Sequence, residues 1–515
     1  MITESERTEF GDFQTPPALA CRVVELLNSR GLAPRTVVEP TCGLGSFVEA
    51  SLTGFRESVA VIAYDVNPDY VQKTSALNRI SSTQGRLICQ VANFFVQDWT
   101  ATLESLLEPI LIIGNPPWVT ASGLGALGST NLPEKSNFQN RRGLDALTGK
   151  SNFDIAEWML LKLIDAGRSR DVTMAMLVKT SVARRVLSHL WRTGANVEAA
   201  SIFRFDATAH FGVSADACLL CCQLGSRSSG ECSVADLDRP DVSLGRVGWR
   251  DGVLVSDLLA YDRQRSLLVS ESGSPTFRWR SGVKHDCSTV MELRRVTTGG
   301  FVNGNGQHLE LEPEYVYPLL KGTDVVHRRV GEVRKWLLIT QGKPGEDTSI
   351  IAKRAPNTWA YLCAHGEQLD SRRSSIYRSR PRFSVFGVGA YTFAPWKVAI
   401  SALHKRLVFA TVGPIEDRPV VFDDTCYHLS CDCEADARLL ASMLNSECSQ
   451  ELLGALVFWD AKRPITTEVL ERLDLRRVAA RLGLASEFDR FAGAVRPSSQ
   501  AVFDFDPASV RSAGR

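Results

Sequence analysis

The 515-residue chain lacks the features that mark several broad classes of protein. No stretch approaches the run of about 18 apolar residues that a membrane-spanning helix needs. The first ten residues are acidic and contain no apolar core of an export signal. Internal repeats and low-complexity tracts are also missing. We therefore expect a folded protein of the cytoplasm that does not contact a membrane.

A strong net charge is missing as well. The 59 Lys and Arg residues nearly balance the 58 Asp and Glu residues, which leaves a formal charge of +1. Residues 1–235 carry 21 basic and 23 acidic side chains (−2), and residues 236–515 carry 38 and 35 (+3). The totals therefore neither demand nor forbid a nucleic-acid partner. A chain of this length predicts two to four domains, at roughly 150 residues each.

Cysteine usage gives no sign of a disulfide framework. The 13 cysteines are an odd number scattered through a long chain, which is typical of reduced thiols. One group could be read as a zinc site, namely Cys426, His428, Cys431 and Cys433. This group lacks paired C-x2-C knuckles, and the surrounding stretch 420–433 predicts a sheet strand. We expect no metal, with zinc at this group as the alternative.

Strand and helix patterns alternate regularly through the first 225 residues. Short apolar runs predict strands at residues 36–39, 61–65, 86–93, 109–114, 172–178, 201–205 and 217–224, with helical patterns between most of them. Crossover helices imply an α/β fold with a mainly parallel sheet that is covered on both faces. Ligands bind such sheets at the carboxyl ends of the strands.

The pattern changes after the small polar run at residues 226–230. Beyond residue 236 the predicted strands are short and irregular, so we expect a mixed α+β domain there. The expected organisation is a first domain at 1–235, a second at 236–485 and a C-terminal tail at 486–515.

A glycine-containing turn, Glu39 to Phe47, follows the first predicted strand directly. Gly43 and Gly45 let backbone approach a ligand closely, although the spacing is not the G-x-G-x-x-G of dinucleotide folds. Asp65 ends the second strand, where a carboxylate can accept hydrogen bonds from a ribose. Each feature alone also fits a purely structural turn.

The tetrapeptide Asn115-Pro116-Pro117-Trp118 is the most specific signal in the chain. Two successive prolines stiffen the backbone and leave carbonyls that only accept hydrogen bonds. The oxygens of the Asn115 side chain and of Pro116 can then face one amino group. Trp118 supplies a flat surface on which a base can stack, at about 1–3 kcal/mol. The alternative is a rigid turn with Trp118 as core filler.

In this order, the motifs resemble those of the gamma-type, TaqI-like DNA adenine-N6 methyltransferases of restriction–modification and related defence systems. The resemblance covers roughly residues 10–225 and implies a Rossmann-like class I methyltransferase sheet. It also implies S-adenosylmethionine as the cofactor, held by Thr15, Glu39, Cys42, Gly43, Gly45, Asp65, Asn93 and Phe94. Asn93 stands where the family usually has Asp.

The same resemblance implies a catalytic role for Asn115, Pro116, Pro117 and Trp118, and the stacking of Phe211 on a flipped adenine. The second domain is then a target-recognition domain for double-stranded DNA. A separate restriction or defence subunit is expected by family analogy alone. Residues 121–150, rich in Gly, Ser and Asn, are a candidate mobile loop over the DNA.

One stretch of the second domain has the composition of a nucleic-acid surface. Residues 371–415 contain eight Lys or Arg and no Asp or Glu, interleaved with aromatic residues. Basic side chains neutralise phosphates and aromatic rings stack on bases. We expect DNA contacts from Arg372, Arg373, Arg378, Arg380, Arg382 and Lys397.

Two other functions remain open at this stage. RNA and protein-glutamine methyltransferases also use Asn-Pro-Pro-aromatic, because their substrates also present an amino group. A catalytically inactive DNA-binding relative is the second alternative. A fused nuclease is not expected, because no E-x-K tripeptide completes the usual metal-dependent cleavage site.

Overall fold

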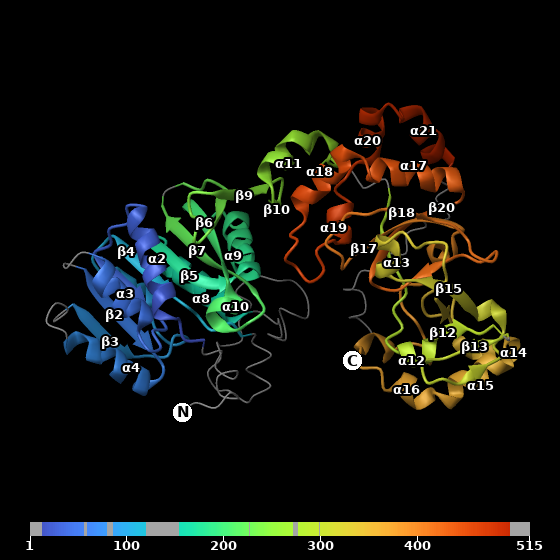
Figure 1. Ribbon diagram of the computed structural model, residues 1–515, viewed down its shortest axis with the longest axis horizontal. Helices are drawn as coiled ribbons and strands as arrows, with labels where there is room; N and C mark the ends of the chain where they lie inside the picture. The colour runs from blue at the N-terminus through green and yellow to red at the C-terminus, as the bar shows by residue number, and fades with distance from the viewer. Residues whose placement is uncertain are drawn as a thin grey trace, which may run out of the picture. The chain divides into compact units, whose positions relative to one another are not determined.

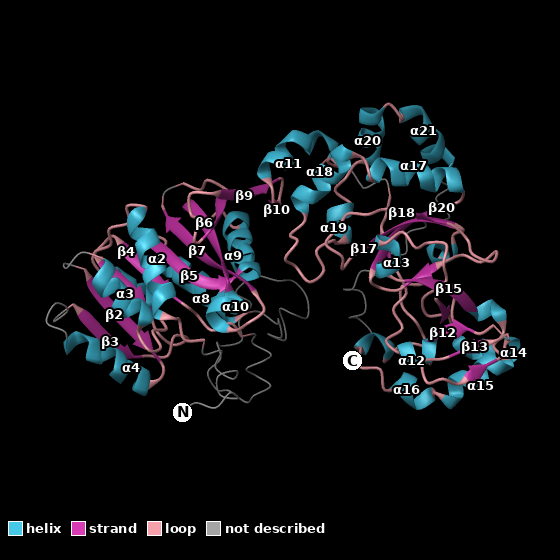
Figure 2. Cartoon of the chain, in the orientation of Figure 1, coloured by secondary structure: helices cyan, strands magenta, loops and turns pink. Residues whose placement is uncertain are grey.

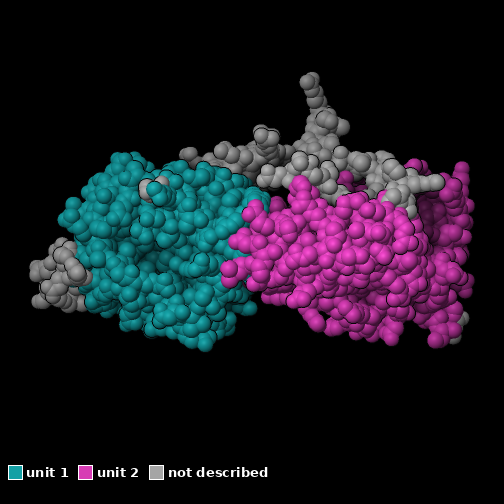
Figure 3. Space-filling view, turned by 90° about the horizontal axis from the view of Figure 1, so that it is seen from above, with its two compact units in different colours: residues 1–258, 510–515 teal, residues 259–509 magenta. Residues whose placement is uncertain are grey.

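The computed structural model describes residues 13–55, 59–79, 86–119, 154–225, 227–270, 277–297 and 299–494. The chain forms two compact units, which are coloured separately in Figure 3. Unit 1 contains the described residues up to Leu258, and unit 2 begins at Leu259. The candidate loop at 121–150 lies outside the described residues. In the described part of the chain, no helix is long and apolar enough to cross a membrane.

Unit 1 is built on a ten-stranded sheet (Figure 1). Across the sheet the strands are β10 (Val253–Val255), β9 (Ser243–Arg250), β8 (Glu231–Asp236), β6 (Val197–Asp206), β7 (Asp216–Leu224), β5 (Val172–Lys179), β4 (Ile110–Gly114), β1 (Thr36–Glu39), β2 (Ala60–Asp65) and β3 (Leu87–Val91). The five strands from β3 to β5 are parallel, and β7 runs antiparallel between β5 and β6. This arrangement is the Rossmann-like class I methyltransferase sheet that the sequence predicted.

The central strands are apolar on both faces because helices cover both. Every residue of β1 and of β4 is buried, as expected of strands inside a parallel sheet. On one face, residues of the helices α2 (Pro17–Ser29) and α3 (Ser46–Gly54) form a continuous core with Val37, Val61 and Leu111. Figure 2 shows helices on either side of the strands. The remaining helical segments of the unit are α4 (Pro68–Ser75), η1 (Ala76–Arg79), α5 (Trp99–Glu104), α8 (Ile155–Ala166), α9 (Thr180–Arg192) and α10 (Ala207–Phe211).

The sheet continues past the expected domain boundary. Residue 235 lies within β8, and β9 and β10 then extend the same sheet. The division between the two units therefore lies at Leu258. The segment expected as a C-terminal tail begins within the helix α21 (Ala485–Ala494).

Unit 2 contains two smaller sheets, which confirms the mixed α+β class of the second half. The six-stranded sheet is ordered β14 (His308–Leu309), β13 (Phe301–Val302), β12 (Glu292–Arg295), β16 (Lys335–Leu338), β15 (Val316–Leu320) and β19 (Val421–Phe422). The four-stranded sheet is ordered β11 (Arg280–Ser281), β20 (Cys426–Cys431), β17 (Trp396–Ser401) and β18 (Ala410–Val412). The strand predicted at 420–433 is thus observed as two strands, β19 and β20.

The helices of unit 2 are short and follow or connect these strands. They are α11 (Leu258–Gln264), η3 (Arg265–Leu267), α12 (Ser288–Met291), η4 (Pro313–Tyr315), α13 (Gly322–Val326), η5 (Thr348–Ile350), α14 (Ile351–Arg354), α15 (Pro356–Ala364), α16 (Gly366–Asp370), η6 (Ser375–Tyr377), η7 (Ala390–Phe393), α17 (Glu434–Leu444), α18 (Glu447–Leu456), α19 (Thr467–Leu470), α20 (Leu475–Leu482) and α21. The unit has its own apolar clusters, one around Trp336 and one around Phe422.

Candidate active site

The turn after β1 wraps backbone N–H groups around the start of α3. Gly43 and Gly45 have φ angles of +50° and +85°, which favour glycine over residues with a side chain. The Gly43 N–H donates to Asp65 Oδ2 at 2.8 Å, so the turn is tied to the end of β2. Asp65 Oδ1 accepts from the Asn67 N–H at 2.8 Å. The carboxylate predicted to bind a ribose is therefore held rigidly beside the turn.

Two apolar side chains flank this turn at the surface. Leu44 and Val66 are 46% and 47% exposed. They directly follow Gly43 and Asp65 in the chain, so they lie at the carboxyl ends of β1 and β2. A planar apolar group bound beside Asp65 would cover exposed hydrocarbon at this edge.

Three buried polar atoms near the ends of β1 and β4 lack a hydrogen-bond partner among the described residues. They are Glu39 Oε2, Thr41 Oγ1 and Asn115 Oδ1. The β1 and β4 strands are neighbours, and a Cβ placed on Gly114 would lie 3.8 Å from Glu39 Cγ. Buried polar atoms are nearly always paired in folded proteins. Their grouping here indicates a place where a polar ligand supplies the missing partners.

Glu39 is the charged member of this group and is only 3% exposed. Burial raises its pKa well above the ordinary value, and the nearby Asp65 raises it further. The Val48 N–H opposes this shift with a hydrogen bond. A cationic ligand would favour the ionised carboxylate. The site therefore fits the positively charged end of S-adenosylmethionine.

The side-chain amide of Asn115 has a fixed orientation. Its Nδ2 donates to the backbone carbonyl of Phe13 at 2.8 Å. A flipped amide would place two oxygens against each other, so Nδ2 must face this carbonyl. Within the part of the chain that the structure describes, the Oδ1 atom is left as an acceptor without a partner, directly before the two prolines.

Three aromatic rings gather beside Asn115. The ring centroids of Trp118 and Phe211 are 5.3 Å apart in an edge-to-face contact, and Phe13 lies within 6.4 Å of both. Trp118 is 6% exposed and its indole N–H donates to the Leu177 carbonyl at 3.2 Å. Phe211 ends α10 before Gly212, whose φ is +69°, and is partly exposed. Phe211 and Phe13 are thus the partly exposed rings of this group, while Trp118 lies in the core.

Asn93 and Phe94 lie mainly inside the protein. The Asn93 Oδ1 accepts from the Phe95 N–H at 2.9 Å and so shapes its own turn. Phe94 is 6% exposed and packs on Trp99, whose indole N–H donates to the Phe94 carbonyl at 3.0 Å. The neighbouring Phe95 is partly exposed.

Thr15 and Cys42 complete the predicted cofactor residues. Thr15 is half-buried, and its carbonyl accepts from the Ser46 hydroxyl at 2.7 Å, which joins it to α3. Cys42 is 4% exposed, and burial raises the pKa of its thiol, so this side chain is a neutral packing group.

An ion pair next to the aromatic group was not predicted from the sequence. Lys179 Nζ donates to the Trp118 carbonyl and to Asp154 Oδ2, each at 2.9 Å. Asp154 is buried, which raises its pKa, while Lys179 lowers it. Asp154 also caps α8, and an Asp before an apolar run is a recognisable signal of such a cap. No sequence signal pairs it with Lys179, 25 residues away.

The six basic residues predicted to contact DNA have different environments in unit 2. Arg373 and Arg378 are exposed. Arg380 lies over the ring of Phe386, and Arg382 is exposed and pairs with Asp370 at 2.7 Å.

The side chains of Arg372 and Lys397 form hydrogen bonds with backbone carbonyls of the unit. Arg372 donates to the carbonyls of His285 and Ser384 and lies 3.7 Å from the centre of the Tyr377 ring. Lys397 is 1% exposed and donates to the carbonyls of Ala394 and Val420. Burial lowers the pKa of Lys397 to about 7. Neither side chain presents a free cationic end to a phosphate in this structure.

Comparisons with known proteins place these features in a family context. No protein-family model matches the chain. The chain is 41% identical over 482 residues to the Type II methyltransferase M.NspV of Nostoc sp. (strain ATCC 29411 / PCC 7524). The match covers 93% of this chain and 99% of that protein.

Two solved structures align with most of the chain at low sequence identity. The Type IIL restriction-modification enzyme MmeI, in complex with DNA, gives a TM-score of 0.49 at 16% identity, covering 96% of this chain and 76% of that one. The type IIG restriction endonuclease BpuSI gives a TM-score of 0.34 at 13% identity, covering 94% and 60%.

Proposed function

The chain belongs to the Type II methyltransferases of restriction–modification systems, and from this we propose that it methylates N6 of an adenine in double-stranded DNA. The observation that carries the proposal is the fixed amide of Asn115. Its Oδ1 is buried, has no hydrogen-bond partner among the described residues, and is directed by the contact of Nδ2 with the Phe13 carbonyl, as an acceptor for an exocyclic amino group must be.

The cofactor that fits the site is S-adenosylmethionine, which supplies an electrophilic methyl group when bound. Asp65 would accept hydrogen bonds from the ribose, and Leu44 and Val66 would cover the adenine ring. Glu39 would face the positively charged end. The N–H groups of Gly43, Leu44 and Gly45 already donate within the protein, so the turn would shape the site without supplying free donors to the ligand.

Asn115 and the Pro116 carbonyl would accept the two N6 hydrogens of the target adenine. With both hydrogens accepted, the nitrogen lone pair would be free to bond the methyl group that S-adenosylmethionine supplies when bound, and the new N–C bond would replace the C–S bond of the cofactor. One N6 proton is then released to water. The adenine must first leave the duplex, at a cost of a few kcal/mol. Stacking on Phe211 would offset part of that cost.

Unit 2 would select the DNA sequence. The exposed basic residues of the 371–415 stretch support DNA binding by this unit, with Arg373 and Arg378 as phosphate contacts. A separate restriction subunit that recognises the same sequence would complete the system. The protein would act in the cytoplasm, where its DNA substrate is found.

The decisive test is Asn115→Ala in a host that lacks adenine methylation. Loss of one transition-state hydrogen bond lowers such rates by about 100- to 1,000-fold, so N6-methyladenine should fall to near background. Binding of sinefungin, an unreactive analogue of the cofactor, should remain. Asn196→Ala, at an exposed residue after α9, is the matched control and should methylate normally.

Several results would refute the proposal. Normal N6-methyladenine from the Asn115→Ala variant would exclude the mechanism. Methylation by the wild-type protein of N4 of cytosine, of RNA or of a protein glutamine, instead of adenine in DNA, would exclude the proposed substrate. Sequencing that maps modified bases in DNA detects N6-methyladenine from the Asn115→Ala variant and distinguishes it from N4-methylcytosine.

A further inference from the structure

The segment Phe13–Thr15 lies just before α2, and each of its three residues is hydrogen-bonded to the site. The Phe13 carbonyl accepts from Asn115 Nδ2, the Gln14 Oε1 accepts from the Leu44 N–H at 2.9 Å, and the Thr15 carbonyl accepts from the Ser46 hydroxyl. Two of these bonds reach the turn after β1, and the third reaches the segment after β4. We call residues 13–15 the strap.

Gln14 is the only member of the strap that uses its side chain for these contacts. Its amide lies directly over the glycine of the turn, since a Cβ on Gly43 would be 2.5 Å from Gln14 Oε1 and 2.9 Å from Nε2. Gly43 in turn donates its N–H to Asp65. A continuous connection therefore runs from Asp65 through Gly43, Leu44 and the strap to Asn115.

The orientation of the Asn115 amide depends on this connection. The terminal torsion of an Asn side chain has broad, shallow minima, so a hydrogen-bond partner must fix it. That partner is the Phe13 carbonyl, a backbone atom whose position is set by the anchors of the strap. Pro16 and Pro17 follow immediately and restrict the backbone between the strap and α2. The strap is consequently a short, stiff link.

We propose that Gln14 is a positioning residue that couples occupancy of the cofactor turn to the orientation of the Asn115 amide, and thereby to binding of the flipped base. A ligand that orders the turn fixes Leu44 and Gln14, and the strap then holds Phe13 against Asn115. The coupling is reciprocal, because a base held by Asn115 stabilises the same arrangement of the turn. The inference rests on the proposed function and names a further residue of that site.

The test measures the affinity for sinefungin with and without a duplex that carries the mapped target adenine. Coupled sites typically differ by about 5- to 150-fold, and we expect a ratio within this range for the wild-type protein. In Gln14→Ala the ratio should fall to about 1–2, while the affinity without DNA changes by less than about 3-fold. Gln14→Glu keeps an oxygen that can accept from the Leu44 N–H and should preserve most of the ratio.

Gln72→Ala, at an exposed glutamine of α4, is the matched control and should keep the wild-type ratio. A wild-type ratio near 1, or an unchanged ratio in Gln14→Ala, would overturn the coupling. Loss of sinefungin affinity without DNA would also overturn it, because Gln14 would then contact the cofactor instead of coupling two sites. These outcomes are separate from failure of the proposed function, which would appear as wild-type protein that leaves no N6-methyladenine in DNA.

Discussion

Individual residues at the ends of β1 and β4 carry a free-energy cost that packing alone does not explain. Glu39 sits in a core position with Oε2 unpartnered among the described residues, next to the negative charge of Asp65. A buried carboxyl without sufficient partners destabilises a fold and is retained where it serves a ligand. The same residue should therefore have opposite effects on the stability of the free protein and on cofactor binding.

The Glu39→Gln variant tests whether Glu39 lowers the stability of the free protein while it strengthens cofactor binding. The raised pKa means that, above the ordinary carboxyl pKa, the folded protein holds a proton that the unfolded chain has released. The free energy of unfolding then falls as pH rises through this window. The Glu39→Gln variant, which is neutral at this position, should unfold at a higher urea concentration than the wild type at pH 8, with the difference shrinking toward pH 4.

Although Glu39→Gln should stabilise the free protein, it should lower the affinity for the cofactor. The loss of a charged hydrogen-bond partner should weaken sinefungin binding by about 10- to 100-fold, measured by calorimetry at pH 8. Equal pH dependence in the two proteins, or unchanged sinefungin affinity, would show that Glu39 is an ordinary core residue.

Secondary-structure elements were easier to predict from the sequence than individual side-chain contacts. The parallel strands, the glycine turn and Asn115 lie where the patterns predicted, because strand period and turn chemistry are local properties. The Asn115–Phe13 and Lys179–Asp154 contacts join residues far apart in the chain, and no local rule pairs them. Lys397 was predicted at a DNA surface because composition records charge without recording that β17 is buried on both faces.

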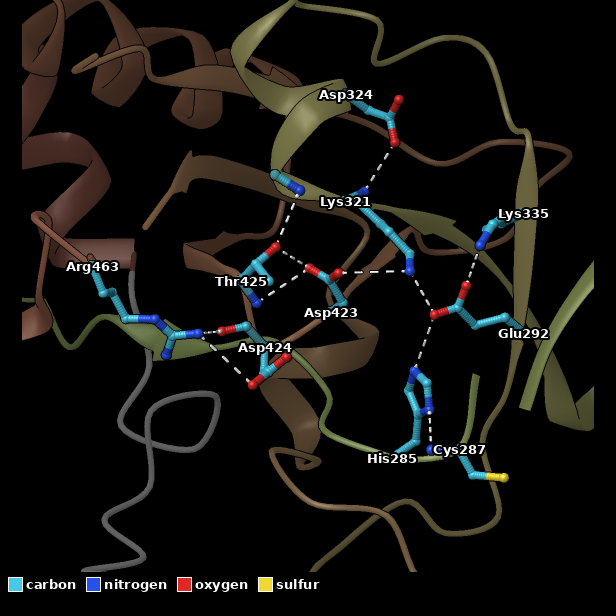
Figure 4. A network of polar contacts seen from close by, with 11 residues as sticks. His285, Cys287, Glu292, Lys321, Asp324, Lys335, Asp423, Asp424, Thr425 and Arg463 are labelled. Atoms are coloured by element: carbon cyan, nitrogen blue, oxygen red, sulfur yellow. Dashed lines mark hydrogen bonds and ion pairs between the residues drawn. The ribbon is translucent and has the colours of Figure 1, made fainter. Parts of the chain in front are cut away.

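A cluster of ionic side chains joins elements of unit 2 (Figure 4). Glu292 on β12 accepts from Lys321 after β15 and from Lys335 on β16, each at 2.5 Å, and its carboxylate lies 3.5 Å from His285 Nε2. Burial raises the pKa of Glu292, but hydrogen bonds from these three side chains outweigh it and hold the pKa well below the ordinary value. Lys321 also lies 4.0 Å from Asp423, between β19 and β20. The cluster thereby joins three strands of the six-stranded sheet to the segment between β19 and β20.

Glu292→Gln should destabilise unit 2 and leave unit 1 intact. Breaking a buried ion pair costs about 3–5 kcal/mol, and the partial exposure of both lysines brings the expected loss to about 2–4 kcal/mol at pH 7. The depressed pKa makes this stabilisation present above the ordinary carboxyl pKa and lost as pH falls. Urea unfolding at pH 7 and pH 4 measures the difference, and sinefungin binding reports on unit 1.

The control is Glu434→Gln, which removes an exposed pair with Arg438 one turn away on α17. Such pairs contribute roughly 0.2–0.5 kcal/mol. If Glu292→Gln cost no more than this control, the cluster would not stabilise the six-stranded sheet.

At the scale of the whole molecule, the near-zero net charge is an average over two units. Each unit has its own apolar core, so each can keep its fold while their surfaces diverge. Residues 1–235 are slightly acidic in total, whereas the 371–415 stretch of unit 2 contains no carboxylate. Arg372 and Lys397 donate to carbonyls of the protein and so add little to the cationic surface of this stretch. Arg373 and Arg378 remain the clearest candidates for phosphate contacts.

The double variant Arg373→Ala/Arg378→Ala should weaken DNA binding through salt-dependent contacts alone. Each phosphate contact contributes about 0.9 to the slope of log affinity against log salt, so the slope should decrease by about 2 and affinity at 0.1 M salt should fall about 10- to 100-fold. Sequence preference and sinefungin binding should be unchanged, because phosphate contacts carry no base information. Arg438→Ala, also at an exposed arginine of unit 2, should alter neither the slope nor the affinity. A wild-type slope in the double variant would show that neither arginine contacts a phosphate, since counterion release must be lost wherever a phosphate contact is removed.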